Sequence, residues 1–540
     1  MHVPRWKPPV ELSRREELIL KRMARVRTLM PFLRRHRHEL FDDAFQTELE
    51  SMYRGTGAGK DPRPPAMFAM ATLLQGYLNV SDAMLVELTA LDLSVQCVLG
   101  CVGGEDTAFS QGAFHDFRVR LIEHNMDVRL LERTVELARA TGEFDAKKLP
   151  KSLRIGIDSA PLQGAGRVED TLNLLAHAGR DIARCAAQLA EKSFEVVCEE
   201  SGATLLLESS VKKALDLDWT RPGVRDVGLR ALLGQLDKLV TWVRKQLPEQ
   251  TTKPPLQETL DTLEQLKKQD LEPDPNSPGG GQRIRRGVAK DRRVSITDKE
   301  MRHGRKNKNK PFAGYKRHIA TDLDTQLIHA VAVTPANVVE HVAAEPLKLA
   351  IETLGFTVGE LYIDRGYLSS PVVQQMLSTS GDVICRPWAF TKPGVFSKLD
   401  FHFNLRDSKV TCPAGIEMPF IEGKQVHFPP ELCTVCPLRS DCTTAKPGRG
   451  RALALAEDER FQEKLRRGLR SQAGRARLRR RAGVEHRLAH LARRTGVHAR
   501  YRGVRKNEFA MRRASAVLNL EVLSRRQPRE IRSISNRSAS

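Results

Sequence analysis

Arg154-Ile-Gly-Ile-Asp158 and Glu360-Leu-Tyr-Ile-Asp364 are two short apolar stretches, each of which ends in an aspartate. Short apolar runs that are followed by small or turn-forming residues are typical of buried β-strands. Taken singly, an aspartate at the end of a strand is more often a turn or cap residue than a functional one. The two stretches gain meaning together, because the segments around them complete an ordered set of elements.

The sequence around these stretches predicts further strands and helices from the periodicity of its apolar residues and from its turn residues. Asp322-Leu-Asp324 marks the turn of a hairpin, and Asn337 with Glu340 three positions later fits a capping box at a helix start. The expected elements are paired strands over 314–321 and 326–333, a helix over 337–354, a helix over 371–378 and a strand over 382–386.

The elements therefore follow one another as one strand, two strands joined by a hairpin, a helix, a strand, a helix and a strand. This is the order of an α/β, ribonuclease-H-like core with a mixed sheet. A right-handed crossover at the helix would place the strands of Asp158 and Asp364 side by side. The carboxyl-terminal ends of both strands would then face the crevice in which open α/β sheets bind ligands. We therefore expect the two aspartates to meet at one edge of the sheet.

The length of 540 residues exceeds that of one ordinary core and indicates several domains. Segment 272–281 is rich in Pro and Gly and predicts a flexible joint. The expected units are a helical N-terminal domain at 1–150, the catalytic core at 151–400 and 451–500 with a helical insertion at about 172–285, a Cys-rich insertion at 401–450 and a basic tail at 501–540.

Apolar residues at three- and four-residue spacing predict helices over 14–33, 65–78 and 81–98, and Ser81 and Ser110 are expected helix N-caps. Several short helices with basic faces suit a DNA-end-binding module. A helical bundle with a purely structural role fits the same pattern equally well.

The charge balance indicates a polyanionic partner. Lys and Arg number 88 and Asp and Glu 66, so the net charge is 88 − 66 = +22. The surplus is concentrated from Lys446 to Ser540 and is mostly Arg, which makes forked contacts to phosphate oxygens. The alternative is a basic surface with no binding function.

Composition also bears on where the protein acts. No run of about 18 apolar residues occurs, and the N-terminal residues lack the apolar core of a secretory leader. We expect a cytoplasmic protein that contacts no membrane. Nine cysteines in such a chain should be thiols or metal ligands rather than disulfides.

A third acidic residue should join the two aspartates if the site acts on DNA. Phosphodiester chemistry uses two magnesium ions about 4 Å apart, which carboxylate oxygens hold. Glu485 lies beside an apolar helical stripe of Val484, Leu488 and Leu491, and Arg481 precedes it by one helical turn. Glu485 is therefore the candidate, although a surface glutamate that offsets nearby arginines would look the same.

Short sequence blocks follow one another from about residue 65 to residue 523. The blocks are Ile157–Thr171, Ser295–Lys306, Gly314–Ala320, Tyr362–Tyr367, Val484–Leu491, Arg502-Gly503 and Asn519-Leu520. In content and order they resemble the blocks of bacterial DDE-type insertion-sequence transposases. Each block is weak alone, and their shared order makes the resemblance specific.

This resemblance implies a ribonuclease-H-like nuclease that cuts insertion-sequence ends and joins 3′-hydroxyls to target DNA. It implies that Asp158, Asp364 and Glu485 hold Mg²⁺ or Mn²⁺. It also implies double-stranded DNA as the partner, both the inverted-repeat ends and the target, a homodimer in the DNA complex, and a bacterial protein that is nucleoid-associated when bound to DNA. Arg305 and Lys316 lie in the middle blocks and are candidate DNA contacts.

Related families carry a Tyr, Arg, Glu, Lys signature around the last acid. Arg481 and Glu485 fit this signature, and Arg481 is a further candidate DNA contact. Leu478 replaces the Tyr, and Ala492 stands where the Lys is expected, with Arg493 adjacent as a candidate substitute. The departure leaves the details of DNA-end binding open.

Cys412, Cys433, Cys436 and Cys442 form a C-x20-C-x2-C-x5-C set. One close pair with two flanking cysteines is consistent with a structural zinc site, and free thiols in an insertion loop are the alternative. The other cysteines, which stand in apolar contexts and are expected to be buried thiols, are Cys97, Cys101, Cys185, Cys198 and Cys385.

Two further patterns are weaker. Segment 55–60 resembles a nucleotide-binding loop, but Asp61 stands where a Ser or Thr should hold magnesium, and no buried strand precedes the segment. His303, His318 and His341 are expected to contact DNA or to pack locally rather than to bind metal.

Two other functions are consistent with the same residues. A non-catalytic DNA-binding or regulatory protein that retains the scaffold would also need the basic tail and the helical N-terminus. A nuclease of the same fold without strand transfer is the third candidate. Metal-dependent DNA cleavage separates the first of these from an active transposase.

Overall fold

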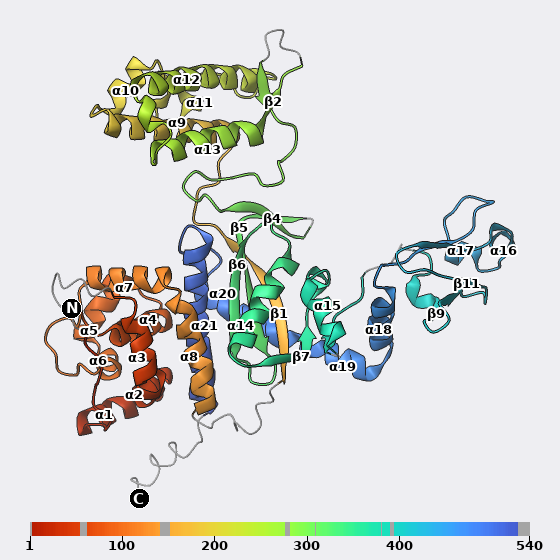
Figure 1. Cartoon of the computed structure of the whole chain (residues 1–540), viewed down its shortest axis with the longest axis horizontal. Coiled ribbons are helices and arrows are strands. Elements are labelled where there is room, and N and C mark those ends of the chain that lie inside the picture. Colours follow the sequence, from red (N-terminus) through yellow and green to blue (C-terminus); the bar gives the residue numbers. More distant parts are fainter. Residues whose placement is uncertain are drawn as a thin grey trace, which may run out of the picture.

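The computed structural model describes residues 3–53, 62–140, 152–275, 281–307, 309–379, 381–388 and 394–526. Figure 1 shows a helical N-terminal bundle, a central sheet, a separate helical insertion and a small strand-rich unit. The loop-like segment 55–60 lies outside the described residues. None of the described helices has the length and apolarity that a membrane span requires.

The N-terminal bundle consists of short helices around one apolar core. Its helices are α1 (Arg14–Met23), α2 (Leu29–Leu40), α3 (Asp43–Glu50), α4 (Pro65–Leu78), α5 (Asp82–Leu91), α6 (Leu93–Leu99), α7 (Gln111–Glu123) and α8 (Met126–Ala140). Ser81 and Ser110 cap α5 and α7, as predicted: each hydroxyl accepts a backbone N–H of the first helical turn.

Two of the predicted N-terminal helices are each divided in the structure. The helix predicted over 14–33 becomes α1 and α2, since Pro31 lacks an N–H and belongs in the first turn of α2. The helix predicted over 81–98 is divided at Asp92. This residue ends α5, and its carboxylate accepts the N–H groups of Ser94 and Val95 at the start of α6.

The central sheet is mixed and has six strands, which confirms the predicted α/β fold class. Its strands are β1 (Ser152–Gln163), β4 (Arg302–Asn307), β5 (Lys310–Asp322), β6 (Ile328–Pro335), β7 (Thr357–Tyr362) and β8 (Asp382–Ile384). The order is β4-β5-β1-β7-β8, and β6 pairs with β5 further along that long strand. β1 is antiparallel to β5 and parallel to β7, as a right-handed crossover between them allows. This arrangement is consistent with a ribonuclease-H-like core.

The first strand is longer than predicted. Asp158 was expected at its end, but β1 continues to Gln163 because its second half still pairs with β5, from Asp158 opposite Ile319 to Gln163 opposite Gly314. Asp158 is therefore a mid-strand residue whose side chain faces the end of the neighbouring β7.

Among the described helices, two lie between the last strands of the sheet in the chain, and four more follow the Cys-containing unit or lead from it. They are α14 (Ala344–Thr353), α15 (Pro371–Ser378), α18 (Glu459–Arg470), α19 (Gln472–Arg480), α20 (Ala482–Thr495) and α21 (Val504–Arg526). The predicted capping box of Asn337 and Glu340 is wrong. The Asn337 amide donates to Lys290 and Asp291, and Glu340 begins a short 3-10 helix, η3 (Glu340–Ala343), ahead of α14.

The helical insertion between β1 and β4 has its own apolar core and stands apart from the sheet (Figure 1). Its elements are α9 (Thr171–Leu189), α10 (Phe194–Glu200), η1 (Thr204–Leu206), α11 (Val211–Ala214), α12 (Val224–Gln246), η2 (Pro248–Gln250), α13 (Leu256–Asp270), β2 (Leu271–Pro273) and β3 (Gln282–Ile284). The prediction of a flexible joint is wrong at its two ends. There the chain forms β2 and β3, which pair antiparallel with each other. Residues 276–280 of the joint lie outside the described residues.

The Cys-containing unit follows the last strand of the central sheet and is built around Phe and Val side chains. Its elements are η5 (Lys398–Asp400), β9 (His402–Asn404), β10 (Lys409–Thr411), β11 (Glu417–Pro419), β12 (Gln425–His427), α16 (Pro430–Thr434), α17 (Arg439–Cys442) and β13 (Ala452–Ala454). The buried Lys398 ammonium, 2.7 Å from the Glu459 carboxylate on α18, ties this unit to the helices that lead to the site.

The predicted basic tail is wrong for residues 504–526, which form the buried helix α21. Phe509, Val517 and Leu520 are among its fully buried side chains, so this segment belongs to the apolar core rather than to a solvated tail. Residues 527–540 lie outside the described part of the chain. α21 contacts α4, α8 and β6, and Figure 1 shows it beside α8 between the bundle and the sheet.

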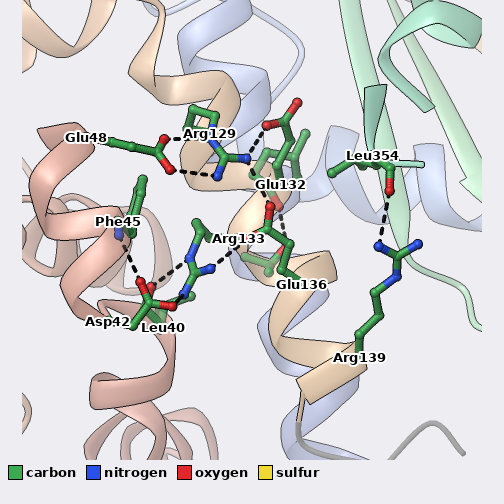
Figure 2. A network of polar contacts seen from close by, with 12 residues as sticks. Leu40, Asp42, Phe45, Glu48, Arg129, Glu132, Arg133, Glu136, Arg139 and Leu354 are labelled. Atoms are coloured by element: carbon green, nitrogen blue, oxygen red, sulfur yellow. Dashed lines mark hydrogen bonds and ion pairs between the residues drawn. The ribbon is translucent and has the colours of Figure 1, made fainter. Parts of the chain in front are cut away.

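Helix α8 is the other link between the bundle and the core. Figure 2 shows Arg129 paired with Glu48 and Arg133 paired with Asp42, which joins α8 to the α2–α3 segment. One helical turn or more further on, Arg139 points the other way and donates to the Leu354 carbonyl at 3.1 Å, where α14 of the core ends. The bundle and the sheet are therefore connected by polar contacts as well as by apolar packing.

Asn519 on α21 is expected to be essential for stability. Its amide accepts the Ile328 N–H and donates to the Ile328 carbonyl, both at 2.8 Å, and also donates to Thr134 on α8 at 3.0 Å. Asn519→Leu should lower the calorimetric melting temperature, since each buried polar group left unpaired costs about 1–3 kcal/mol. Ser524→Ala on the same helix is the control and should change stability by less than about 0.5 kcal/mol. Equal melting of both variants would contradict the assignment.

Candidate active site

One open pocket of about 470 Å³ gathers acidic residues from distant parts of the chain. Asp158 comes from β1, Asp364 from the turn after β7, and Glu485 from the first turn of α20. The remaining lining residues are Ser159, Ala160, Pro161, Arg305, Lys306, Phe312, Lys316, Glu340, Leu488, Ala489 and Ala492. The pocket is thus acidic at its centre and basic along one side.

Strand register brings the two aspartates together. In the parallel pair of β1 and β7, Gly156 is opposite Tyr362. Asp158 and Asp364 each follow this opposed pair by two residues, so they lie at the same height along the two strands. Asp364 also caps the 3-10 helix η4 (Arg365–Tyr367), because its carboxylate accepts the Gly366 N–H at 2.8 Å. The cap role that the sequence left open for Asp364 therefore exists alongside its place in the pocket.

A glycine lets α20 approach the sheet. A Cβ added at Gly156 would lie 2.8 Å from the Cβ of Val484 and 2.9 Å from a methyl of Leu323, closer than such carbons ever pack. Val484 is fully buried against β1, and Glu485 is the next residue along the helix. The missing side chain at residue 156 therefore sets how near Glu485 comes to Asp158.

The carboxylates are held in an unfavourable environment for negative charge. Burial raises the pKa of Asp158 to about 6, and the charges of Asp364 and Glu485 act in the same direction. The Ser159 N–H and Arg481 oppose this shift. The pKa of Asp364 is also raised, first by burial and then by the charge of Glu340. A cation in the pocket would relieve these repulsions.

Arg481 supplies a counter-charge to two of the pocket acids. Its guanidinium forms an ion pair with Glu485 one turn further along the chain, and its Nη1 lies 3.6 Å from a carboxylate oxygen of Asp158. Nη1 is buried and finds no hydrogen-bond partner among the described residues. Arg481 therefore stands between the first and third acids as the positive group that they share.

A neutral histidine, His318, is buried beside the pocket and hydrogen-bonded to two hydroxyl groups. His318 on β5 is fully buried, and its ring nitrogens lie 2.8 Å from the Tyr367 hydroxyl and 3.0 Å from the Thr334 hydroxyl. Burial lowers the pKa of His318 to about 3, so the ring carries no charge at neutral pH. His318 packs locally, one of the two roles expected for it.

Of the other predicted DNA contacts, two line the pocket and one does not. Arg305 and Lys316 line the pocket, from β4 and β5. The Lys316 ammonium donates to the Val338 carbonyl at 2.9 Å and lies 3.9 Å from Glu340. Arg493 is exposed on α20, two turns beyond Glu485, and does not line the pocket.

Glu340 is a pocket residue that the sequence pattern did not identify. Its position after Asn337 suggested a helix cap, and only the return of the chain from β6 toward α14 brings it beside Asp364. Ser159 also lines the pocket and was likewise not identified as a site residue. A glutamate that follows a turn carries no local signal of the residues it will meet in the fold.

The donor chemistry of the pocket suits a divalent ion. Carboxylate oxygens are the ligands that Mg²⁺ and Mn²⁺ prefer, and the Arg481 guanidinium occupies a place that favours positive charge. Across the described residues, however, no group of three or more His, Cys, Asp or Glu side chains is arranged so that it could hold a metal ion. Glu485 is paired with Arg481, so a cation would require this side chain to turn inward.

The four cysteines of the 401–450 region line one small cavity. The Cys412 sulfur accepts the Ile416 N–H at 3.3 Å, and the Cys433 sulfur accepts the Arg451 N–H at 3.5 Å. Burial raises the pKa of Cys442; Arg451 opposes the shift, and the three other cysteines add to it. All nine cysteines are free thiols, and the other five are buried or half-buried.

Comparison with known proteins gives a match to a protein-family model. Residues 282–520 match the family model described as a transposase DDE domain. The mixed α/β sheet is consistent with a ribonuclease-H-like core, and this match supports a DDE-type transposase. The matched segment contains Asp364 and Glu485 and begins after Asp158. No curated protein and no solved structure matches the chain.

Gly156→Ala should disturb the pocket through packing alone. The added methyl would overlap Val484 and Leu323, and such overpacking typically costs about 1–3 kcal/mol. We expect a lower melting temperature and weaker divalent-ion binding, because α20 carries Glu485 away from Asp158. Gly112→Ala in α7, where an added Cβ meets nothing within 4 Å, is the matched control and should lose neither. If Gly156→Ala melts and binds ions like the wild type, the contact between Gly156 and Val484 does not fix the position of α20.

Proposed function

We propose that this protein is a DNA transposase of bacterial insertion sequences, which cuts the ends of the element and joins their 3′-hydroxyls to target DNA. The observation that carries the proposal is the pocket lined by Asp158, Asp364 and Glu485, from three distant segments. The family match over residues 282–520 supports the same function independently. The excess of basic residues suits a DNA partner.

The three acids are proposed as the ligands of Mg²⁺ or Mn²⁺. When bound, such ions activate the attacking oxygen and stabilise the leaving oxygen of the phosphodiester. The charges of Asp364 and Glu485 both raise the pKa of Asp158. A cation held by the three carboxylates would offset this repulsion.

The basic side of the pocket is proposed to hold the DNA backbone. Arg305 and Lys316 line it directly, and exposed Arg493 lies further along α20. Arg481 would neutralise Asp158 and Glu485 in the free protein. If the carboxylates held cations, the Arg481 guanidinium would be available to a phosphate oxygen, for which its forked donors are suited.

The proposal extends to the setting of the reaction. The protein is expected to act in the bacterial cytoplasm and to associate with the nucleoid through DNA. An element has two ends, so two copies of the chain in the DNA complex would provide one pocket for each end. The partners are therefore the inverted-repeat ends, the target DNA and a second copy of the protein.

Removing any one of the three carboxylates should abolish cutting. Asp158→Asn, Asp364→Asn and Glu485→Gln keep the size of each side chain and remove its charge. We expect magnesium-dependent cleavage of DNA carrying the element ends to fall at least about 100-fold, because metal stabilisation of the transition state is worth several kcal/mol. DNA binding in a gel-shift assay should remain.

Glu345→Gln is the control, because Glu345 is an exposed acid on α14 away from the pocket. A triad variant that cuts like the wild type would remove that residue from the site. If the wild-type protein binds DNA but does not cut it in Mg²⁺ or Mn²⁺, the protein is a DNA-binding or regulatory relative of the transposases instead.

The four cysteines that line one cavity are proposed to hold a structural zinc ion. Four thiolates complete a tetrahedral zinc site, and backbone N–H donors to the sulfurs, as at Cys412 and Cys433, are typical partners of bound thiolates. Zinc would then fix a unit whose apolar core is small.

Metal analysis of the purified full-length protein should find about one zinc per chain. Cys436→Ser should lose that zinc and unfold the unit more readily, whereas Cys101→Ser in the N-terminal bundle should retain it. If wild-type protein purified under reducing conditions carries no zinc, the four cysteines are free thiols and the zinc proposal is wrong.

A further inference from the structure

Glu340 lines the pocket beside Asp364. η3, which carries Glu340, contacts η4, which follows Asp364. Glu340 is the charged neighbour that acts most strongly on Asp364, ahead of Arg481 and Glu485. The pocket therefore contains a fourth carboxylate, close to Asp364.

The two oxygens of Glu340 have different surroundings. Oε1 accepts the Ser159 hydroxyl at 2.8 Å and lies 3.9 Å from the Lys316 ammonium. Oε2 has no hydrogen-bond partner among the described residues and faces Gly366 and Asp364. One oxygen is thus anchored, and the other is free to bind a ligand in the pocket.

Gly366 makes this approach possible. A Cβ added there would lie 2.2 Å from Oε2 of Glu340 and 3.1 Å from a carboxylate oxygen of Asp364. Any larger residue would fill the space between the two carboxylates. The backbone of Gly366 is not in the left-handed region, so this glycine is required by space rather than by its conformation.

The pairing of Glu340 does not balance its charge. The Lys316 ammonium at 3.9 Å is at the limit of an ion pair and donates its hydrogen bond to the Val338 carbonyl instead. Two carboxylates that meet across a glycine repel each other unless a cation lies between them.

We propose that Glu340 is a fourth acidic ligand of the divalent-ion site, which binds the ion on the Asp364 side through its free oxygen. This inference rests on the proposed function. The Ser159 hydroxyl holds the other oxygen, which leaves the free oxygen facing Gly366 and Asp364. The pocket is then lined by four acids: Asp158, Asp364, Glu485 and Glu340.

The test is calorimetric titration of the full-length protein with Mn²⁺ in the absence of DNA. Glu340→Gln keeps the hydrogen bond to Ser159 and removes the charge. We expect it to weaken Mn²⁺ binding by roughly tenfold or more, the usual effect of losing a residue that supports a metal site. Asp364→Asn is measured beside it, and Glu345→Gln is the control for loss of an acid on the adjoining helix.

The outcomes separate the two proposals. Weak binding by both Asp364→Asn and Glu340→Gln, with Glu345→Gln like the wild type, supports the role of Glu340. If Asp364→Asn binds weakly and Glu340→Gln binds like the wild type, Glu340 is not a ligand and the proposed function stands. If Asp364→Asn also binds like the wild type, the proposed function itself fails.

Glu340→Asp is a second variant that tests the proposal even if Glu340→Gln fails to fold. It keeps the negative charge near Lys316 but withdraws the carboxylate by one methylene. Circular dichroism establishes that each variant is folded. We expect Glu340→Asp to bind Mn²⁺ more weakly than the wild type, and wild-type affinity in this folded variant would overturn the proposal.

Discussion

The parallel pairing of β1 with β7, closed from one face by α20, is the constraint on which the acidic pocket depends. Gly156 is opposite Tyr362 in the pair, and each strand leads to an aspartate two residues later. The same glycine leaves room for Val484 and so fixes the helix that carries Glu485. One backbone position thus sets the distances among three acids that are far apart in the sequence.

The pocket is organised around an excess of negative charge. Burial and mutual repulsion disfavour the ionised form of Asp158, and Arg481 compensates for only part of this cost. Acidic groups whose pKa values are shifted in this way are common at functional sites. The neutral His318 and its two hydroxyl partners support the pocket without adding further charge.

The remainder of the chain supports this centre from three sides. α8 and α21 attach the N-terminal bundle to β6 and α14, partly through the buried Asn519. The helical insertion and the Cys-containing unit interrupt the core at two loops and carry cores of their own. The chain can therefore be long while the sheet at its centre remains small.

The sequence by itself determined the mixed α/β class, the capping serines at 81 and 110, helices such as 65–78 and 371–378, and the three acids as candidates, because periodicity and turn chemistry are local properties. Only the tertiary structure decided that Asp158 lies within a strand, that residues 504–526 are buried, and that Glu340 faces Asp364 rather than capping a helix. These features depend on contacts between distant segments, and a side chain's own neighbours in the sequence do not reveal which distant residues it will meet.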